Sequence, residues 1–319
     1  MAVVQPGSKV DHYTVDQLIA RSDTASIYWG TDESTGRPVA LKIPHPEIEG
    51  DLLFYQRFQR ERDICERLDH PGIVKAFPDA GRTQVYIAME LAEGQLLRRI
   101  LHEQGKLPAD RAVRIALSIA DALEYMHAHR VVHRDLKPEN VLVNSEDRIK
   151  LIDFGIASQA GARRLTFGKL SQVMGTPDYI SPEQVKGKRG DRRTDIYAVG
   201  VILYEMLTGR TPFTGKNAYA IMHARLVSDP VPPCEVNLSI TPQLQAVICR
   251  ALRRDPTHRY QSASDFSNDL RHLEQVPVTT GPSPGSRQRT LTQAPLFYCI
   301  LAMIPVLIFA LLLYVACHT

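Results

Sequence analysis

The chain has 319 residues, of which 23% are charged, and its formal net charge is +3. This length allows a two-lobed globular unit with a sizeable apolar core. The weak net charge does not indicate a nucleic-acid-binding protein, and we expect no nucleic-acid partner. The five cysteines form no C-x-x-C pair and have irregular spacings, which fits a reducing compartment without a disulfide framework. No basic and apolar leader opens the chain, so we expect no export signal.

The N-terminal part of the sequence favours a β-rich lobe. Apolar runs bounded by turn residues predict strands over residues 13–19, 26–31 and 38–43. Apolar residues at helical spacing then predict a helix from about residue 53 to 68. A further apolar run predicts a strand over residues 85–90.

The following part favours helices. Apolar residues from Ala112 to Met126 recur at i, i+3, i+4 and i+7, and predict a long buried helix that ends near His129. The short apolar runs 141–143 and 149–152 flank a polar turn and predict a hairpin. Further helices are expected at residues 194–204, 217–226, 241–252 and 263–274. The pattern as a whole predicts an α+β protein.

The composition changes sharply after about residue 275. Residues 275–295 are rich in Pro, Thr, Ser, Gly and Gln and indicate a flexible linker. Residues 296–317 contain no charged residue and no histidine, and as a helix they are long enough to cross the roughly 30 Å hydrocarbon core of a bilayer. Arg287 and Arg289 precede this stretch, so the positive-inside rule places the preceding chain in the cytoplasm. We therefore predict a single transmembrane helix in the inner (cytoplasmic) membrane.

The most specific motif is the octapeptide HRDLKPEN at residues 133–140. Asp-Phe-Gly follows at 153–155, and Ser-Pro-Glu follows at 181–183. In this order the three motifs resemble those of the eukaryotic-like (Hanks-type) serine/threonine protein kinases of bacteria, although that family usually has Ala-Pro-Glu at the third. The resemblance covers roughly the first 275 residues. It implies a bilobal protein-kinase fold over residues 13–274, with an N-lobe of about 13–90 and a C-lobe of about 94–274.

The resemblance also implies a reaction, the transfer of the γ-phosphate of ATP to serine and threonine hydroxyls of cytoplasmic proteins. Asp135 would position the substrate hydroxyl, and Lys137 would offset charge on the γ-phosphate. Asn140 and Asp153 would supply oxygen ligands to Mg²⁺, or alternatively Mn²⁺. His127 and His133 have no third ligand at zinc spacing and are expected to be structural.

In the N-lobe, Lys42 of Val-Ala-Leu-Lys resembles the lysine that contacts the α- and β-phosphates. Its partner is expected to be Glu61, with Asp63 as the weaker alternative. Met89 would stand behind the adenine, main-chain groups of Glu90 and Ala92 would bond its edge, and Glu93 would face the ribose. The ring would lie among Ile19, Ile27, Ala40 and Leu142, beside Ala20.

The activation segment, residues 156–180, contains two candidate regulatory phosphosites, Thr166 and Ser171. Arg134 would pair with an added phosphate by charge-assisted hydrogen bonds. Autophosphorylation in a homodimer is a further expectation from the family. Supporting roles are expected for an ion pair between Glu183 and Arg259, and for Asp195, which would cap its helix and hold the catalytic loop.

The clearest departure from the family lies in the loop that should read G-x-G-x-x-G. Ala20, Ser22 and Ala25 occupy all three glycine positions, and Asp23 adds a negative charge near the triphosphate. An active kinase with weakened ATP binding or slowed transfer is therefore expected. The alternative is a membrane-tethered pseudokinase or scaffold with little phosphotransfer, and a small-molecule kinase on the same fold fits less well.

Overall fold

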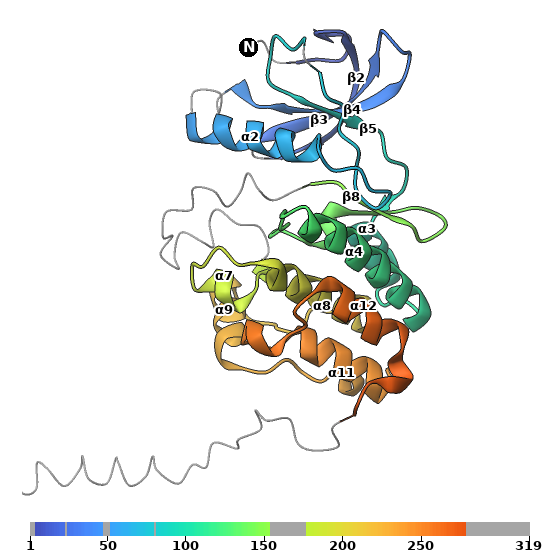
Figure 1. Ribbon diagram of the computed structural model, residues 1–319, viewed down its shortest axis with the longest axis vertical. Coiled ribbons are helices and arrows are strands. Elements are labelled where there is room, and N and C mark those ends of the chain that lie inside the picture. The colour runs from blue at the N-terminus through green and yellow to red at the C-terminus, as the bar shows by residue number, and fades with distance from the viewer. Residues whose placement is uncertain (1–3, 23, 47–51, 80, 154–176, 279–319) are drawn as a thin grey trace, which may run out of the picture. The chain divides into compact units, whose positions relative to one another are not determined.

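The computed structural model describes residues 4–22, 24–46, 52–79, 81–153 and 177–278 (Figure 1). Its N-terminal part is a five-stranded antiparallel sheet in the order β1-β2-β3-β4-β5. The strands are β1 (Lys9–Val10), β2 (Tyr13–Arg21), β3 (Ala25–Asp32), β4 (Pro38–Pro44) and β5 (Ile87–Glu90). The helix α2 (Leu52–Cys65) lies beside this sheet (Figure 1). The strands and the helix that the sequence predicts in this lobe are therefore confirmed.

Strand β4 has two faces with different surroundings, because successive side chains of a strand point to opposite sides. Val39, Leu41 and Ile43 belong to an apolar cluster within the N-lobe. Ala40 belongs to a second cluster, which is continuous with the core of the helical lobe. Lys42 shares the face of Ala40, so its side chain points toward the junction of the two lobes.

The C-terminal part is helical and contains a small sheet in the order β6-β7-β8. The strands are β6 (Gln95–Leu96), β7 (Val141–Val143) and β8 (Ile149–Leu151), so the predicted hairpin is confirmed. The helices are α3 (Leu97–Gln104), α4 (Ala109–Ala128), α7 (Pro182–Val185), α8 (Arg192–Thr208), α9 (Ala218–Val227), α10 (Pro233–Val236), α11 (Pro242–Ala251) and α12 (Ala263–Arg271). Short 3-10 turns occupy η1 (Pro138–Asn140), η2 (Pro177–Tyr179), η3 (Pro256–His258) and η4 (Leu273–Gln275).

Helix α8 is the centre of this lobe. Every residue from Thr194 to Leu207 is buried, which is typical of a helix that is apolar on all sides. The expectation that Asp195 caps this helix is wrong. The cap is Asp191, which has an extended backbone and accepts a hydrogen bond from the main-chain nitrogen of Arg193. The helix begins before its apolar pattern does, so Asp195 lies inside the first turn.

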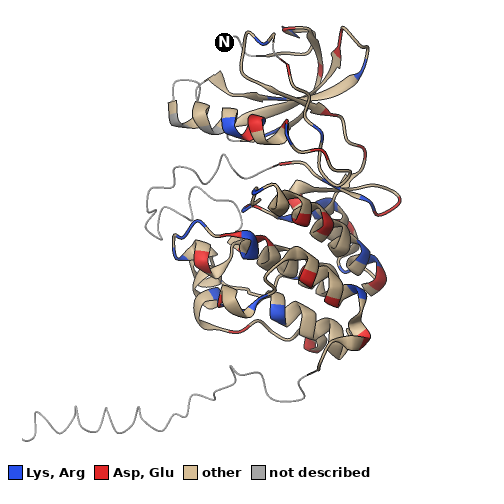
Figure 2. Ribbon diagram, viewed as in Figure 1, with Lys and Arg blue, Asp and Glu red and all other residues tan. Residues whose placement is uncertain are grey.

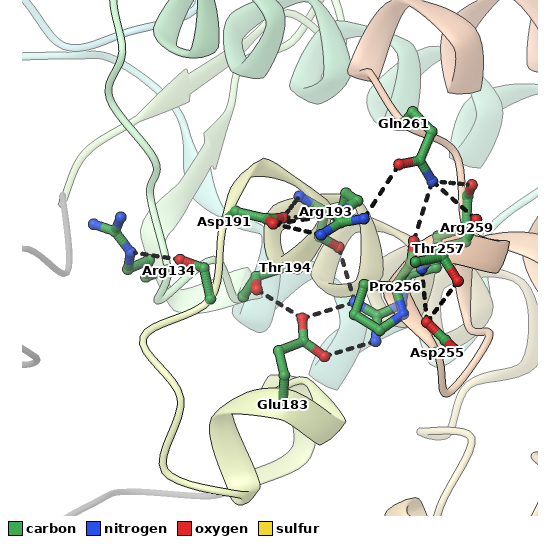
Figure 3. Close-up of polar contacts among 11 residues, drawn as sticks. Arg134, Glu183, Asp191, Arg193, Thr194, Asp255, Pro256, Thr257, Arg259 and Gln261 are labelled. Atoms are coloured by element: carbon green, nitrogen blue, oxygen red, sulfur yellow. Dashed lines mark hydrogen bonds and ion pairs between the residues drawn. The ribbon is translucent and has the colours of Figure 1, made fainter.

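A buried ion pair ties α7 to the segment before α12. The Arg259 guanidinium donates to both carboxylate oxygens of Glu183, at 2.8 and 2.7 Å, as the sequence predicts (Figure 3). Thr194 also donates its hydroxyl to Glu183, at 2.7 Å. The pair therefore joins three elements of the helical lobe.

Acidic and basic residues are interspersed over both lobes (Figure 2), in keeping with the small net charge. Within the described ranges, no helix has both the length and the apolar character needed to cross a membrane. The predicted linker and membrane helix, residues 275–295 and 296–317, fall outside those ranges from residue 279 onward.

Candidate active site

The buried Asp195 of α8 holds the main chain of the catalytic loop, residues 133–140, through hydrogen bonds. Its carboxylate accepts main-chain N–H groups of His133, at 2.9 Å, and Arg134, at 2.8 Å. It also bonds His127 Nε2 at 2.8 Å, so His127 has a structural contact, as expected. Arg134 has a φ of 65°, a left-handed conformation that is rare outside glycine and asparagine. The two bonds to Asp195 come from this strained residue and from the residue before it, and they hold the backbone in this conformation.

Three polar side chains predicted for catalysis lie together in this loop. The Lys137 ammonium donates to Asp135 Oδ2 at 2.8 Å, and the Asn140 amide donates to the Asp135 carbonyl at 2.8 Å. Burial alone would lower the pKa of Lys137, but the neighbouring Asp135 carboxylate raises it, so the lysine is charged. Asp135 Oδ1 accepts no hydrogen bond from any described residue, and an approaching hydroxyl would meet this atom.

Lys42 joins the two lobes through two carboxylates. Its ammonium lies 2.6 Å from Glu61 Oε1, on α2, and 3.0 Å from Asp153 Oδ1. Burial opposes its charge, but Asp153 and Glu61 outweigh burial and raise the pKa of Lys42. The alternative partner, Asp63, instead pairs with Arg62 at 2.8 Å.

The two carboxylates around Lys42 differ in their surroundings. Burial raises the pKa of Glu61, whose side chain is only 3% exposed. Asp153 has a side chain that is 44% exposed, and Lys42 lowers its pKa against the effect of burial. Asp153 is therefore the more exposed of the two carboxylates that Lys42 contacts.

The residues predicted around the nucleotide surround the same junction. Ala40 pairs with Met89 across β4 and β5, and both are buried. Ile27 and Leu142 are half-buried, whereas Ile19 is 51% exposed. The Glu90 main-chain N–H donates to the Lys75 carbonyl at 2.8 Å, so this N–H is not available to a ligand. Ala92 is half-buried and Glu93 is exposed.

The turn between β2 and β3, which follows Ala20 at the end of β2, is closed by Ser22. The Ser22 hydroxyl accepts the N–H groups of Thr24 and Ala25, at 3.4 and 3.1 Å, and donates to the Ala25 carbonyl at 3.0 Å. The Ser22 N–H also donates to the Ala25 carbonyl, at 2.9 Å. Three main-chain N–H groups that a phosphate loop would offer to ATP are therefore occupied within the turn.

Asn140 and Asp153 lie next to each other, because the Ile152 N–H donates to the Asn140 carbonyl at 3.1 Å. The Asn140 amide nitrogen is used by Asp135, which leaves the amide oxygen for a cation. An amide oxygen beside a carboxylate is the donor set that Mg²⁺ prefers. The described residues hold no group of three or more His, Cys, Asp or Glu side chains for a metal, so the remaining ligands would be phosphate and water.

One supporting contact was missed by sequence reasoning. Gln184 donates its side-chain amide to the Arg134 carbonyl at 2.9 Å, and also closes a capping box with Ser181 at the start of α7. The Ser-x-x-Gln spacing signals such a box, but gives no sign of the contact with a loop 50 residues away. Residues 154–176, which include Thr166, Ser171 and most of Asp-Phe-Gly, lie outside the described ranges.

The sheet lobe supplies a paired lysine, and the helical lobe supplies an aspartate, a lysine and an asparagine on one loop. This arrangement is typical of an ATP-dependent phosphotransferase of the kinase class. The sequence model of the protein kinase domain matches residues 13–270. The chain therefore belongs to the protein kinase family, whose members use ATP and a divalent metal ion.

Bacterial serine/threonine kinases are among its relatives. The probable serine/threonine-protein kinase SCO3848 of Streptomyces coelicolor is 37% identical over 264 residues, which is 81% of this chain and 39% of that protein. The serine/threonine-protein kinase PknB of Mycolicibacterium smegmatis is 34% identical over 290 residues, 89% of this chain and 45% of that protein. The chain thus spans less than half of the length of these curated relatives. The solved kinase domain of Mycobacterium tuberculosis PknI aligns with a TM-score of 0.66 and 26% identity over 85% of this chain and 99% of that one.

Proposed function

We propose that this chain is an active serine/threonine protein kinase that uses MgATP and acts on proteins in the cytoplasm. The observation that carries the proposal is the Lys42 ion pair with Glu61, 2.6 Å long, which couples α2 to the nucleotide strand. Lys42 is held where it would contact the α- and β-phosphates. A bound Mg²⁺ on Asn140 and Asp153 would neutralise phosphate charge.

The transfer itself follows from the geometry of the catalytic loop. The substrate hydroxyl oxygen forms a bond to the γ-phosphorus, the bond to the ADP oxygen breaks, and the hydroxyl proton passes to Asp135 Oδ1. Lys137 holds the other oxygen of Asp135 and offsets charge on the moving phosphoryl group. No covalent intermediate is required, because positioning and charge neutralisation supply the catalysis.

An assay of residues 1–280 with labelled ATP and Mg²⁺ tests this proposal, with autophosphorylation and a generic serine peptide as readouts. Asp135→Asn is expected to abolish transfer, a loss of at least about 10³-fold, with an unchanged circular dichroism spectrum. Asp121→Asn, an exposed aspartate on α4 that lies 3.4 Å from His70, is the matched control and should leave the rate unchanged. Unchanged transfer by a folded Asp135→Asn protein would refute the assignment.

The closed β2–β3 turn gives the rival function some support. If the Ser22 hydrogen bonds prevent the main-chain amides of this turn from binding the phosphates of ATP, the chain is a pseudokinase. It would then bind proteins or nucleotide with little phosphate transfer. Transfer by the wild-type protein above the Asp135→Asn background excludes this rival. The absence of phosphate transfer by the wild-type protein with every metal ion tried favours the pseudokinase.

We also propose that phosphorylation of Thr166 or Ser171, within an assembled pair of chains, switches the enzyme on. Burial, Arg189 and Arg60 lower the pKa of Arg134, while Asp195 opposes them. Arg189 and Arg60 are exposed and have no hydrogen-bond or ion-pair partner among the described residues, so a phosphate would relieve this repulsion. Mass spectrometry of the active protein should find one of the two residues modified. A fully active, unmodified Thr166→Ala/Ser171→Ala double variant would count against the switch.

A further inference from the structure

Trp29 is the one tryptophan of the chain, and it lies on β3 beside the proposed nucleotide site. Its chain neighbour Tyr28 belongs to the apolar cluster within the N-lobe, whereas Ile27 packs against the cluster that continues into the helical lobe. Because successive side chains of a strand point to opposite faces, Trp29 points to the same face as Ile27. Lys42, the direct partner of Ile27 across β3 and β4, belongs to this face, which borders the junction of the lobes.

The register of the sheet places Trp29 in one row with two residues predicted around the adenine. Ala40 is the direct partner of Trp29 across β3 and β4, and Met89 is the direct partner of Ala40 across β4 and β5. Directly opposite residues of an antiparallel pair share a face, with Cβ atoms about 4.5–5.5 Å apart. Lys42 and Ile27 form the neighbouring row, where phosphates are expected. The row that ends at Trp29 therefore corresponds to the nucleoside end of ATP.

This row opens to solvent at Trp29. Ala40 and Met89 are each 7% exposed, whereas Trp29 is 43% exposed. The Trp29 side chain makes no hydrogen bond and no ring contact with any described residue, so its indole N–H remains available to a ligand. Ile19, on the adjacent strand β2, is a second exposed apolar residue. Since tryptophan is highly buried on average, this exposure beside a predicted base site indicates a surface that a ligand covers.

We infer that Trp29 binds the nucleoside end of ATP, with its indole ring against the adenosine, and so contributes affinity that the closed β2–β3 turn does not supply. The inference rests on the proposed function and adds a binding residue to that site. An indole ring favours contact with a nucleobase, because both are planar π-systems and their contact buries apolar area. The turn, in contrast, has three main-chain N–H groups occupied by its own hydrogen bonds.

Isothermal titration calorimetry of the full-length Asp135→Asn protein with adenosine, ADP and ATP tests the contact. Adding Trp29→Ala should raise Kd about tenfold for all three ligands, because the lost contact lies at the part that they share. Trp29→Phe keeps an aromatic ring and should restore most of the affinity. Glycine in place of Ala20, Ser22 and Ala25 should instead strengthen the binding of ADP and ATP and leave that of adenosine unchanged, because only phosphates meet that turn.

Leu18→Ala is the matched control. Leu18 lies on β2 and is 44% exposed, much as Trp29 is, but its direct partner Tyr28 belongs to the N-lobe cluster on the other face of the sheet. Its loss should leave all three Kd values unchanged. Equal effects of Leu18→Ala and Trp29→Ala would show a general change in the sheet and would overturn the inference. A folded Trp29→Ala protein with unchanged Kd values would overturn it as well.

The fluorescence of Trp29 keeps the inference testable if Trp29→Ala does not fold, as judged by its melting temperature. Because the chain has no other tryptophan, quenching by acrylamide reports directly on the exposure of this ring. Saturating adenosine should lower the quenching constant by about half, since a stacked base covers one face of the indole. Equal quenching constants with and without adenosine, or no binding of adenosine at all, would refute the contact.

The Asp135→Asn background separates this inference from the proposed function, because binding is then measured without phosphate transfer. A contact at Trp29 in a chain whose wild type transfers no phosphate supports the inference and favours a pseudokinase that binds nucleotide. Conversely, an active wild type with a KM for ATP that Trp29→Ala leaves unchanged, together with unchanged Kd values, refutes the contact while the kinase function stands.

Discussion

Ser22 shows how one small side chain can change the phosphate loop. Glycine at this position leaves the loop amides free to approach a triphosphate, whereas the Ser22 hydroxyl binds the N–H groups of Thr24 and Ala25. Each bond within the turn contributes only about 0.5–1.5 kcal/mol net, so ATP can compete for these amides at a cost. The expected result is a weakened enzyme rather than an inactive one.

Restoring Ala20, Ser22 and Ala25 to glycine should raise kcat/KM for ATP, since the turn loses the hydroxyl that occupies its amides. The expected gain is about 3–30-fold, which corresponds to one or two hydrogen bonds. Steady-state kinetics with varied ATP measures it. Ser22→Ala separates the two effects, because it removes the hydroxyl and keeps the bulk, and about half of the gain is expected from it. No gain in either variant would show that the turn is not limiting.

At the scale of elements, the helical lobe depends on buried charges that join segments far apart in sequence. Glu183 at the start of α7 meets Arg259, whose side chain is fully buried, across 76 residues. Burial would raise the pKa of Glu183, but the bonds from Arg259 and Thr194 outweigh it and lower the pKa. Removing one partner of such a pair leaves the other buried and unpaired, which is the costly case.

Glu183→Gln should lower the free energy of unfolding by about 3 kcal/mol at pH 7, measured by urea denaturation of residues 1–280. Because the folded pKa of Glu183 lies below its unfolded value of 4.5, its stabilisation is fully present above that value and is lost as the pH falls through the folded pKa. The difference in free energy of unfolding between wild type and variant should therefore shrink as the pH falls from about 5 to about 3.5, a range around the reference pKa of glutamate.

Glu103→Gln provides the comparison for this prediction. Glu103 pairs with Arg99 on the surface of α3 and is 44% exposed, so its loss should lower the free energy of unfolding far less than the loss of Glu183. Equal effects of the two substitutions would show that the Glu183 pair is not worth more than an exposed one.

At the scale of the whole molecule, the site exists only where the lobes meet. Lys42 and Asp153 are 111 residues apart in sequence and 3.0 Å apart in space. The lobes are also joined by the main chain, because the N–H groups of Val74 and Leu151 donate to the carbonyls of Leu151 and Gly72, each at 2.9 Å. The compact unit that contains this junction ends at Val278.

Residues 296–317, which the sequence predicts to form a membrane anchor, follow that unit. Deleting residues 296–317 should move the kinase from the membrane fraction to the soluble fraction with its activity retained, because the catalytic groups all precede Val278. Fractionation followed by an activity assay measures both. Full-length protein that is already soluble, or that high salt or alkaline carbonate strips from membranes, would contradict the anchor.

The sequence by itself determined the order of the elements and the identity of the reacting groups. The apolar runs of β4 and α8, and the motif at residues 133–140, are local features whose physical meaning does not depend on distant partners. The pairing of Lys42 with Glu61 rather than Asp63 was also predicted, but only from the resemblance, because both acids belong to the same charged helix.

Only the tertiary structure decided the contacts for which neither a motif nor a resemblance gave a partner. Asp191 rather than Asp195 caps α8, since the cap depends on where the preceding loop turns into the helix. Ser22 closes its turn through hydrogen bonds that no spacing rule indicates. The hydrogen-bond partners of Arg98, on α3, lie 41, 81 and 107 residues away, so nothing in its helix distinguishes it from the neighbouring Arg99. The physical reason is that helix and strand periods arise from nearby residues, whereas an ion pair depends on the packing of whole elements.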